Sequence, residues 1–383
     1  KKAKSGDIFF LHPGTYNQSN IVIDTDSLTF VGFGAGVELV AEDSLFILSE
    51  VNQCRFQNLT LRGTSASISL IVQNTTNLYF TNVELSCSTQ VFSDTTFWKD
   101  GYVRSLRVGG IKWTGANALL NAENVRFGGD DIPITDETKL GVWFTLGARC
   151  YMNHCQVNSR TGATYSPALV FADNNTKGFL YFTRIISDLG EAILAYDSSL
   201  VYISNTYYET THATSPALKD STFATIVTRN SDVYTISDTA WIHKSDNYGV
   251  STFTSFKGSI CTYPGSGKLH MMGTNAIYTN GSSPIQDNGN SLVGLPFSYI
   301  DFGIATYSGT SGNVVISKNS FINSTVSLGS YNLEDTQTAS GDATQSYDPD
   351  SGTLTAYRSS TANTSGAKIS YLGLTVTNTM PAR

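Results

Sequence analysis

The stretch Phe80-Thr81-Asn82-Val83-Glu84-Leu85 recurs along the chain, and this recurrence decides the fold. Each copy reads apolar, polar, Asn-like, apolar, variable, apolar. The other copies occupy residues 56–61, 122–127, 152–157, 182–187, 203–208 and 236–241. Successive copies begin roughly 21 to 42 residues apart, a period that is typical of a solenoid.

The third position of the motif predicts a bend between two strands. The apolar residues on either side alternate as in a strand, and the polar pair between them turns the chain without breaking this inward pattern. Asn tolerates the left-handed conformation that such a bend needs, and stacked amides can hydrogen-bond at the sheet spacing of about 4.8 Å. This predicted asparagine ladder, with polar substitutes, consists of Asn58, Asn82, Asn124, His154, Arg184, Asn205 and Asp238.

The same register predicts the core. The residue after each ladder position is expected to point inward and to stack on its equivalent in the next coil. This inward column is Leu59, Val83, Val125, Cys155, Ile185 and Thr206. Asn58, as a ladder member, is also expected to turn inward.

The opening of the chain resembles the pectin-lyase-like superfamily of right-handed parallel β-helices. Residues 5–23, SGDIFFLHPGTYNQSNIVI, look like the first turn of that family, and residues 28–43, LTFVGFGAGVELVAED, look like the second. The resemblance covers residues 4–323 and implies an all-β, right-handed, single-stranded parallel β-helix. It says little about activity, because the superfamily contains lyases, hydrolases, esterases, phage tailspikes and non-catalytic fibres.

The rhythm of the coils is interrupted in three places, and the composition changes near the end. A β-helix is therefore expected over residues 1–330, with loop insertions near 88–115, 130–140 and 282–312. Residues 331–352 are polar and strand-poor, as in a linker. Residues 353–383 contain two alternating segments and are expected to form a small C-terminal β module that caps the solenoid or associates with other chains.

Charge and composition exclude several classes of partner. The formal net charge is -7 and only 14% of residues are charged, with no basic stripe, so nucleic acid is not expected as a partner. No apolar stretch is long enough to span a bilayer. The five cysteines show no paired spacing and are expected to be buried free thiols, which favours folding in a reducing compartment. The dispersed His and Cys residues predict no metal site, and no cofactor motif is present.

Catalytic residues are sought in columns. The acids that follow the third strand of successive coils are candidates because adjacent and alternate rungs, about 5 and 10 Å apart, bracket the carboxylate spacings of glycosidases. These candidates are Asp130, Asp131, Asp188, Glu191 and Glu209, with Asp130 and Asp188, or Asp188 and Glu209, as pairs. Scattered acids on a solvated face are the simpler interpretation. The motif sets of polygalacturonases, pectate lyases and pectin methylesterases are not present.

Aromatic residues on turns suggest contact with sugar rings. The candidate glycan-binding residues are Trp98, Tyr102, Trp143, Tyr165 and Arg160. Two hypotheses follow. In the first, the chain is a spike, tail fibre or capsid-associated protein on a virion surface or otherwise extracellular. It then binds host or capsule polysaccharide, contacts other virion proteins and forms a homo-oligomer such as a trimer. In the second, it is a polysaccharide hydrolase or lyase.

Overall fold

The computed structural model describes residues 2–41, 46–63, 70–73, 77–86, 89–92, 95–103, 111–127, 142–159 and 167–262, and the strand segments given below between 269 and 378. The chain divides into two compact units, Lys1–His212 and Ala213–Arg383. All the regular structure of the described residues is β-strand. The expected all-β class is confirmed.

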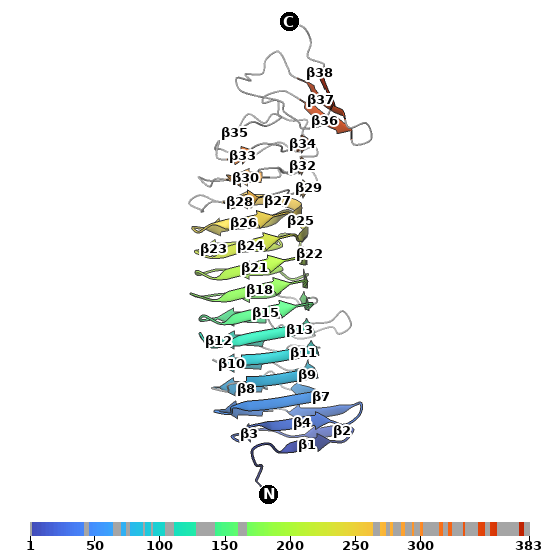
Figure 1. The fold of residues 1–383 in the computed structure, drawn as a ribbon, viewed down its shortest axis with the longest axis vertical. Helices are drawn as coiled ribbons and strands as arrows, with labels where there is room; N and C mark the ends of the chain where they lie inside the picture. The colour runs from blue at the N-terminus through green and yellow to red at the C-terminus, as the bar shows by residue number, and fades with distance from the viewer. Residues whose placement is uncertain are drawn as a thin grey trace. The chain divides into compact units, whose positions relative to one another are not determined.

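The Lys1–His212 unit is a parallel β-solenoid in which every coil contributes a strand to each of three stacks (Figure 1). The first stack contains β1 (Ile8–Leu11), β4 (Leu28–Gly32), β7 (Gln53–Gly63), β9 (Asn77–Ser86), β11 (Thr95–Val103), β13 (Leu119–Phe127), β15 (Arg149–Asn153), β18 (Lys177–Tyr181) and β21 (Leu200–Ser204).

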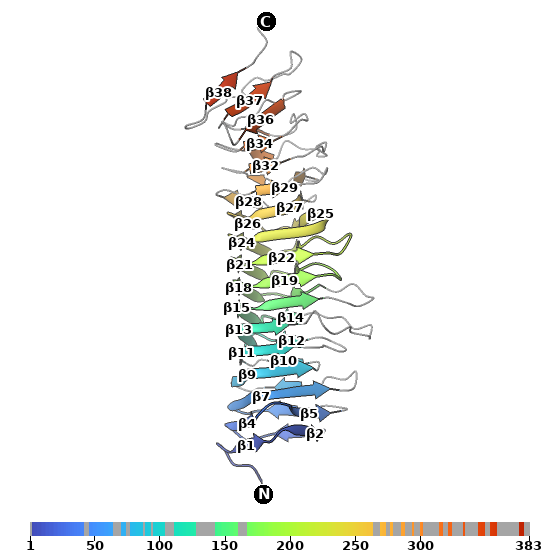
Figure 2. The same ribbon diagram turned by 90° about the vertical axis from the view of Figure 1, so that its right-hand side faces the viewer.

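The second stack begins with two separate strands and then continues as the second halves of β7, β9, β11 and β13. Figure 2 shows this stack from the side. Its separate strands are β2 (Gly14–Asn17), β5 (Val37–Ala41), β16 (Gln156–Ser159), β19 (Arg184–Ser187) and β22 (Tyr207–Thr210).

The third stack closes each coil. It contains β3 (Ile21–Ile23), β6 (Phe46–Ser49), β8 (Leu70–Gln73), β10 (Thr89–Phe92), β12 (Ile111–Thr114), β14 (Val142–Thr145), β17 (Leu169–Phe171) and β20 (Ile193–Ala195).

The Ala213–Arg383 unit is also built of stacked parallel strands. One stack contains β23 (Leu218–Thr222), β25 (Asp232–Ser245), β27 (Ser255–Thr262) and β30 (Ile285–Asp287). A second contains β24 (Thr225–Arg229), β26 (Gly249–Thr252), β28 (Leu269–Met272), β31 (Val293–Gly294), β33 (Val314–Ile316) and β35 (Asn332–Leu333). The first parts of β25 and β27 pair with each other and begin a third stack. This stack continues with β29 (Ala276–Tyr278), β32 (Tyr299–Asp301) and β34 (Phe321–Asn323).

A separate sheet of three strands follows within this unit. It contains β36 (Thr344–Asp348), β37 (Thr353–Tyr357) and β38 (Thr375–Asn378), with β36 antiparallel and β38 parallel to β37. β37 and β38 lie in the segment expected as a C-terminal β module. β35 and β36 both lie in the segment 331–352 expected as a linker, so this polar segment contains strands as well.

The solenoid interior is filled by like residues stacked from coil to coil. Phe30 stacks on the buried Phe56 with ring centroids 5.2 Å apart. Phe9 stacks on Phe30 at 5.0 Å but is 36% exposed. Phe144 stacks in the same way on Trp113 and on Phe171. Burying each such side chain contributes roughly 1.5–3 kcal/mol, because a parallel strand points alternate residues to the same face of every coil.

Two expected loop insertions contain strands instead. Residues 88–115 include β10, β11 and β12, and β11 pairs in parallel with both β9 and β13. This region therefore contains a further coil. The repeat pattern does not reveal it, because it carries Asp100-Gly101 where the coils around it carry Asn82-Val83 and Asn124-Val125. Residues 282–312 include β30, β31 and β32. The third expected insertion, 130–140, lies outside the described residues.

The predicted inward column is correct except at one coil. Leu59 pairs with Val83, and the register continues through Gly101 and Val125 to Cys155. In the next coil Thr183, buried at 2% exposure, is level with Cys155 and Thr206. Ile185 is also buried but stands two residues further on, between Val157 and Tyr208.

The cysteines behave as small buried hydrophobic residues. Cys54, Cys150, Cys155 and Cys261 are buried free thiols, and Cys87 lies outside the described residues. Burial raises the pKa of the Cys54 thiol to about 12 and that of Cys155 to about 11. The prediction of buried free thiols is confirmed for these four.

Candidate functional site

A column of residues with left-handed backbone conformation runs along the Lys1–His212 unit, where the first stack of strands turns into the second. We call it the bend column. Its members are Asn58, Asn82, Asp100, Asn124, His154, Phe182 and Asn205, with φ between 48° and 55°. The strand pairs on either side of each member set them level with one another. Such a φ costs an ordinary L-residue roughly 1–2 kcal/mol, and Asn and Asp tolerate it best.

Hydrogen bonds join some neighbouring members of the bend column. Asn82 Nδ2 donates to Asn58 Oδ1 at 3.1 Å, and Asn124 Nδ2 donates to Asp100 Oδ1 at 2.7 Å. Asn205 Nδ2 instead donates to Ser204 Oγ of its own coil at 3.1 Å. An amide ladder running the whole length of the solenoid therefore stays a prediction.

The polar members of the bend column face outward. Asn58, Asn82, Asp100 and Asn124 are all exposed, whereas the residues that follow them point into the core. The expectation that Asn58 turns inward is wrong, because the left-handed residue occupies the outer corner of the bend. This places a row of amides and one carboxylate at the surface.

A groove of about 490 Å³ lies over the first four members of the bend column. Residues 34–37, which connect β4 to β5, form part of its lining, and the start of the second stack forms another part. The side chains that begin the second stack and line the groove are Thr60, Glu84 and Arg126. Glu84 and Arg126 lie two coils apart in one column, each level with position 102 of β11.

Further along the bend column the polar groups give way to rings. His154 and Phe182 stack with their centroids 5.1 Å apart and their planes 9° apart. Phe182 is 54% exposed, although Phe is a poor residue for a left-handed bend. Stacking on His154 offsets part of that cost. An exposed pair of stacked rings therefore follows the polar residues along the bend column.

Two members of the predicted ladder are not placed in this column. Arg184 stands two residues after the bend, where it pairs with Gln156 and Tyr207, and Phe182 occupies the bend itself. The expected alignment of residues 182–187, with Arg184 in the third position, is therefore two residues out of register in this coil. Asp238 lies in β25 near a register shift, and its side chain is outside the described residues.

The candidate glycan-binding residues are scattered. Trp98 is 1% exposed and packs edge-on against Phe80, so it belongs to the core and not to a sugar-binding surface. Trp98 falls within the loop insertion expected near 88–115, but the structure places it in strand β11. Trp143 is half-buried on β14. Arg160, Tyr165 and the side chain of Tyr102 lie outside the described residues.

Three of the five acidic candidates fall among the described residues, and each of the three is buried or hydrogen-bonded to a neighbour. Glu191 is 1% exposed, so it is a poor candidate for contact with a polymer. Asp188 Oδ1 accepts a hydrogen bond from Thr211 Oγ1 at 2.5 Å, and Glu209 Oε2 accepts one from Tyr207 Oη at 3.0 Å. These partners tie Asp188 and Glu209 to their own neighbours. Asp130 and Asp131 lie outside the described residues.

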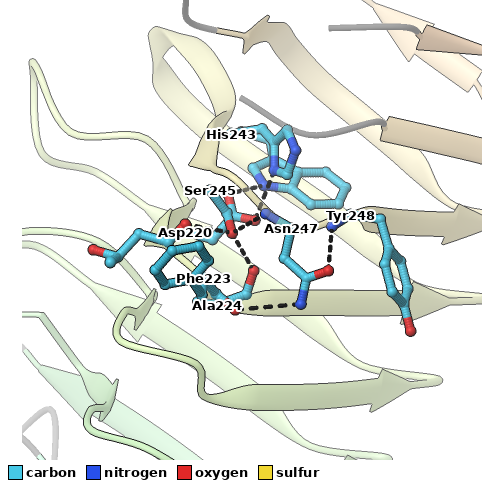
Figure 3. A network of polar contacts seen from close by, with 9 residues as sticks. Asp220, Phe223, Ala224, His243, Ser245, Asn247 and Tyr248 are labelled. Carbon is cyan, nitrogen blue, oxygen red and sulfur yellow. Dashed lines mark hydrogen bonds and ion pairs between the residues drawn. The ribbon is translucent and has the colours of Figure 1, made fainter. Parts of the chain in front are cut away.

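A second polar cluster lies in the interior of the Ala213–Arg383 unit (Figure 3). His243 Nδ1 is 2.7 Å from Asp220 Oδ2, and Trp241 Nε1 donates to Asp220 Oδ1 at 3.1 Å. All three side chains are 0% exposed. Such a carboxylate–histidine pair can orient a proton-transfer group, but a site closed to solvent cannot receive a polymer. We assign this cluster to the core.

The turn beside this buried cluster is fixed by side chains that bond to the backbone. Ser245 Oγ donates to the carbonyl oxygens of Thr222 and Ala224 at 3.1 and 2.5 Å. Asn247 Nδ2 donates to the carbonyl oxygen of Phe223 at 3.3 Å, and its own Oδ1 accepts from the Tyr248 amide at 3.0 Å (Figure 3). These bonds satisfy main-chain groups where two coils turn together.

Sequence reasoning missed Asp100, Glu84 and Arg126 as site residues. Glu84 and Arg126 sit in the variable position of the repeat, two residues after the bend. That position is outward and displaced from the corner, so aligning the repeats and reading this column would have found them. Asp100 would have been found by accepting Asp as an Asn-like residue in Trp98-Lys99-Asp100-Gly101-Tyr102.

The described residues include no group of three or more His, Cys, Asp or Glu side chains that could hold a metal ion. Nor do they include a helix of the length and hydrophobicity needed to cross a membrane. Comparison of the whole chain with protein-family models, curated proteins and solved structures finds no significant match.

Proposed function

We propose that this chain is a structural β-solenoid of a virion surface or another extracellular assembly, and that it binds a glycan in the groove over the bend column. We further propose that it is a right-handed helix of the pectin-lyase-like kind, closer to tailspikes and fibres than to pectinases. The observation that carries the binding proposal is the groove of about 490 Å³ with Asn58, Asn82, Asp100 and Asn124 in its lining.

The chemistry of these groups supports sugar binding. A primary amide offers two donors and an acceptor, and a carboxylate offers acceptors only, so together they match the hydroxyl groups of a sugar. Their backbone is fixed by strand pairs on both sides of each bend. A row of preorganised polar groups loses little conformational entropy on binding, which favours a long ligand that follows the solenoid axis.

Aromatic side chains on the outer face of the first stack support the same proposal. Tyr79 and Phe97 stack at 5.1 Å, and the Arg55 guanidinium lies 4.1 Å from the Tyr79 ring centroid. On later coils Tyr151 and Phe179 stack at 4.7 Å. Aromatic surfaces commonly contact the apolar faces of sugar rings. These residues stand on strands that lead directly into the bend column.

The assembly context rests on the thiols and the composition. A chain with four buried free cysteines is suited to folding in a reducing compartment before it is exposed to the outside, as in virion assembly in a cytosol. The proposed partners are host or capsule polysaccharide, other virion proteins and further copies of the chain, for example in a trimer.

A polysaccharide panel tests the proposal. The purified protein is titrated with neutral and anionic polysaccharides, binding is followed by calorimetry, and each mixture is then assayed for reducing ends and unsaturated products. We expect binding without cleavage. Absence of binding to every member of the panel would contradict the glycan proposal. Release of product would favour the alternative hypothesis, a polysaccharide hydrolase or lyase.

A further inference from the structure

The hydrogen bonds between neighbouring members of the bend column have a direction. This direction makes the pair Asn82 and Asp100 different from the pairs on either side. The two bonds that join neighbouring members both run from the Nδ2 of one coil to the oxygen of the preceding coil, from Asn82 to Asn58 and from Asn124 to Asp100. Asn82 directs its amide nitrogen toward Asn58, where one of its two Nδ2 hydrogens is used, and its Oδ1 is therefore turned to the Asp100 side. Asp100, as a carboxylate, donates nothing.

The step from Asn82 to Asp100 thus brings two hydrogen-bond acceptors level with each other. Both side chains are exposed and both line the groove. Among the described residues, no hydrogen bond joins them. Since the two acceptors do not satisfy each other, a ligand hydroxyl at this step can donate to either of them.

Core packing next to Asp100 fixes the position of its backbone. Gly101 follows it, and a Cβ atom at Gly101 would lie 1.8 Å from Trp98 Nε1, because the indole of Trp98 occupies the space that Val83 and Val125 fill in neighbouring coils. Trp98 is itself 1% exposed. Close packing in the core therefore restricts movement of the backbone at Asp100, so Asp100 cannot easily approach Asn82.

The charge of Asp100 is directed at the groove. Lys99, the cation next to Asp100 in the chain, forms its ion pair with Glu123, at 3.8 Å on the outer face of the first stack. Arg126 also lines the groove, on the following coil. No ion pair to Asp100 is found in the part of the chain that the structure describes. A carboxylate in this position attracts hydroxyl donors and repels carboxylates or sulfates on a ligand.

We propose that Asp100 determines which glycans the groove accepts: a hydroxyl of a neutral sugar donates to Asp100 beside the Asn82 Oδ1, and anionic polysaccharides are disfavoured. This inference rests on the proposed glycan-binding function and deepens it. The specificity is a difference of affinities, obtained partly from an attraction and partly from a repulsion built into the groove.

The test compares Asp100→Asn with Glu123→Gln. Both variants remove one exposed carboxylate from the same region, but Glu123 does not line the groove. Each protein is titrated with galactomannan and dextran as neutral probes and with polygalacturonate and alginate as anionic probes. We expect Asp100→Asn to weaken neutral binding by about tenfold, as for loss of one hydrogen bond to a charged group, and to strengthen anionic binding. Glu123→Gln is expected to leave the ratio of the two unchanged.

The possible failures are distinguishable. If the wild-type protein binds no probe, the proposed function itself is overturned. If it binds but Asp100→Asn and Glu123→Gln change the neutral-to-anionic ratio equally, only the role of Asp100 is overturned. If anionic probes bind more tightly after calcium is added, and Asp100→Asn abolishes that gain, a bridging cation replaces the proposed hydroxyl and the inference is wrong.

A second readout needs no ligand. Asn at position 100 can donate to Asn82 while still accepting from Asn124, and it tolerates the left-handed bend. We therefore expect Asp100→Asn to raise the melting temperature relative to the wild type, whereas Glu123→Gln leaves it nearly unchanged. A lower melting temperature for Asp100→Asn would show that the carboxylate already receives donors from both sides, and would contradict the facing acceptors.

Discussion

The two units of the chain differ in where they hold a group of polar side chains, one in its core and the other at its surface. In the Ala213–Arg383 unit, Asp220, His243 and Trp241 are fully buried and bonded to one another. In the Lys1–His212 unit, Asn82 and Asp100 lie in an open groove. The inner group has its bonds fixed by the fold, so it contributes to the stability and uniqueness of the core. The outer group keeps bonding capacity for a ligand.

The largest effect is expected from breaking the inner group. Asp220→Ala leaves the Trp241 indole N–H and the His243 ring without their shared carboxylate in a closed interior. We expect a loss of roughly 3–5 kcal/mol in the free energy of unfolding. Denaturant unfolding measures this, with Asp246→Ala as the control, because Asp246 is exposed on the same coil region. If both variants lose the same small amount, the buried cluster is not part of the stabilising core.

Two tryptophans sharpen the contrast between satisfied and unsatisfied polar groups. Trp241 Nε1 donates to Asp220, whereas Trp98 Nε1 is buried without a hydrogen-bond partner among the described residues. Replacing each with Phe removes a similar volume. We expect Trp241→Phe to cost about 1–3 kcal/mol more than Trp98→Phe, since only the former loses a bond to a charged group. Equal losses in the two melting curves would mean that the bond to Asp220 adds nothing.

A third prediction concerns the bend column itself. Asn124 has φ of 53°, a conformation that Asn tolerates because its side-chain amide can hydrogen-bond locally. Asn124→Ala keeps the β-carbon in this left-handed bend without the amide, whereas Asn124→Gly removes the β-carbon as well. Both variants lose the same bond to Asp100. We expect the Ala variant to be less stable than the Gly variant by about 1 kcal/mol in thermal or denaturant unfolding. A Gly variant that is the less stable of the two would argue against a left-handed residue at this corner.

The smallest effect is a dependence on alkaline pH. Burial raises the pKa of Cys54 to about 12 in the folded protein, while an unfolded thiol titrates near 8.5. The stability from keeping this thiol neutral is complete below pH 8.5 and is lost as pH rises toward the folded pKa. At pH 9 we expect wild-type stability to have fallen by less than about 1 kcal/mol relative to Cys54→Ala. Parallel pH profiles for the two proteins would show that Cys54 titrates freely.

The fold was predictable because one physical requirement repeats. Every coil needs a residue that tolerates a left-handed bend between two apolar alternations, and Asn58, Asn82 and Asn124 display it openly. The repeat pattern missed one coil and misaligned another. The missed coil has Asp100 followed by a glycine, which breaks the apolar pattern. The misaligned coil has Phe182 at the bend, where it stacks on His154. Tertiary packing, which a local pattern does not contain, decided both.

The candidate site was harder to predict than the fold. Spacing along the chain predicts where the bend lies, but it does not predict whether the side chain at the bend faces the core or the solvent. The expectation that Asn58 turns inward is wrong for this reason. Aromatic character alone did not separate Trp98, which packs in the core, from Tyr79, which stacks on the surface. The groove depends on the connection between β4 and β5 lying beside the column, a relation that no local motif records.

The most direct measurement of the central claim locates a bound glycan on the protein. Side-chain amide signals of Asn58, Asn82 and Asn124 are assigned by single substitution and followed by NMR while an oligosaccharide of the tightest-binding polysaccharide is added. The account predicts that these three signals shift together and saturate with the calorimetric affinity, while the exposed Asn247 amide in the other unit stays unchanged. Saturable binding that leaves all three groove amides unperturbed would contradict it.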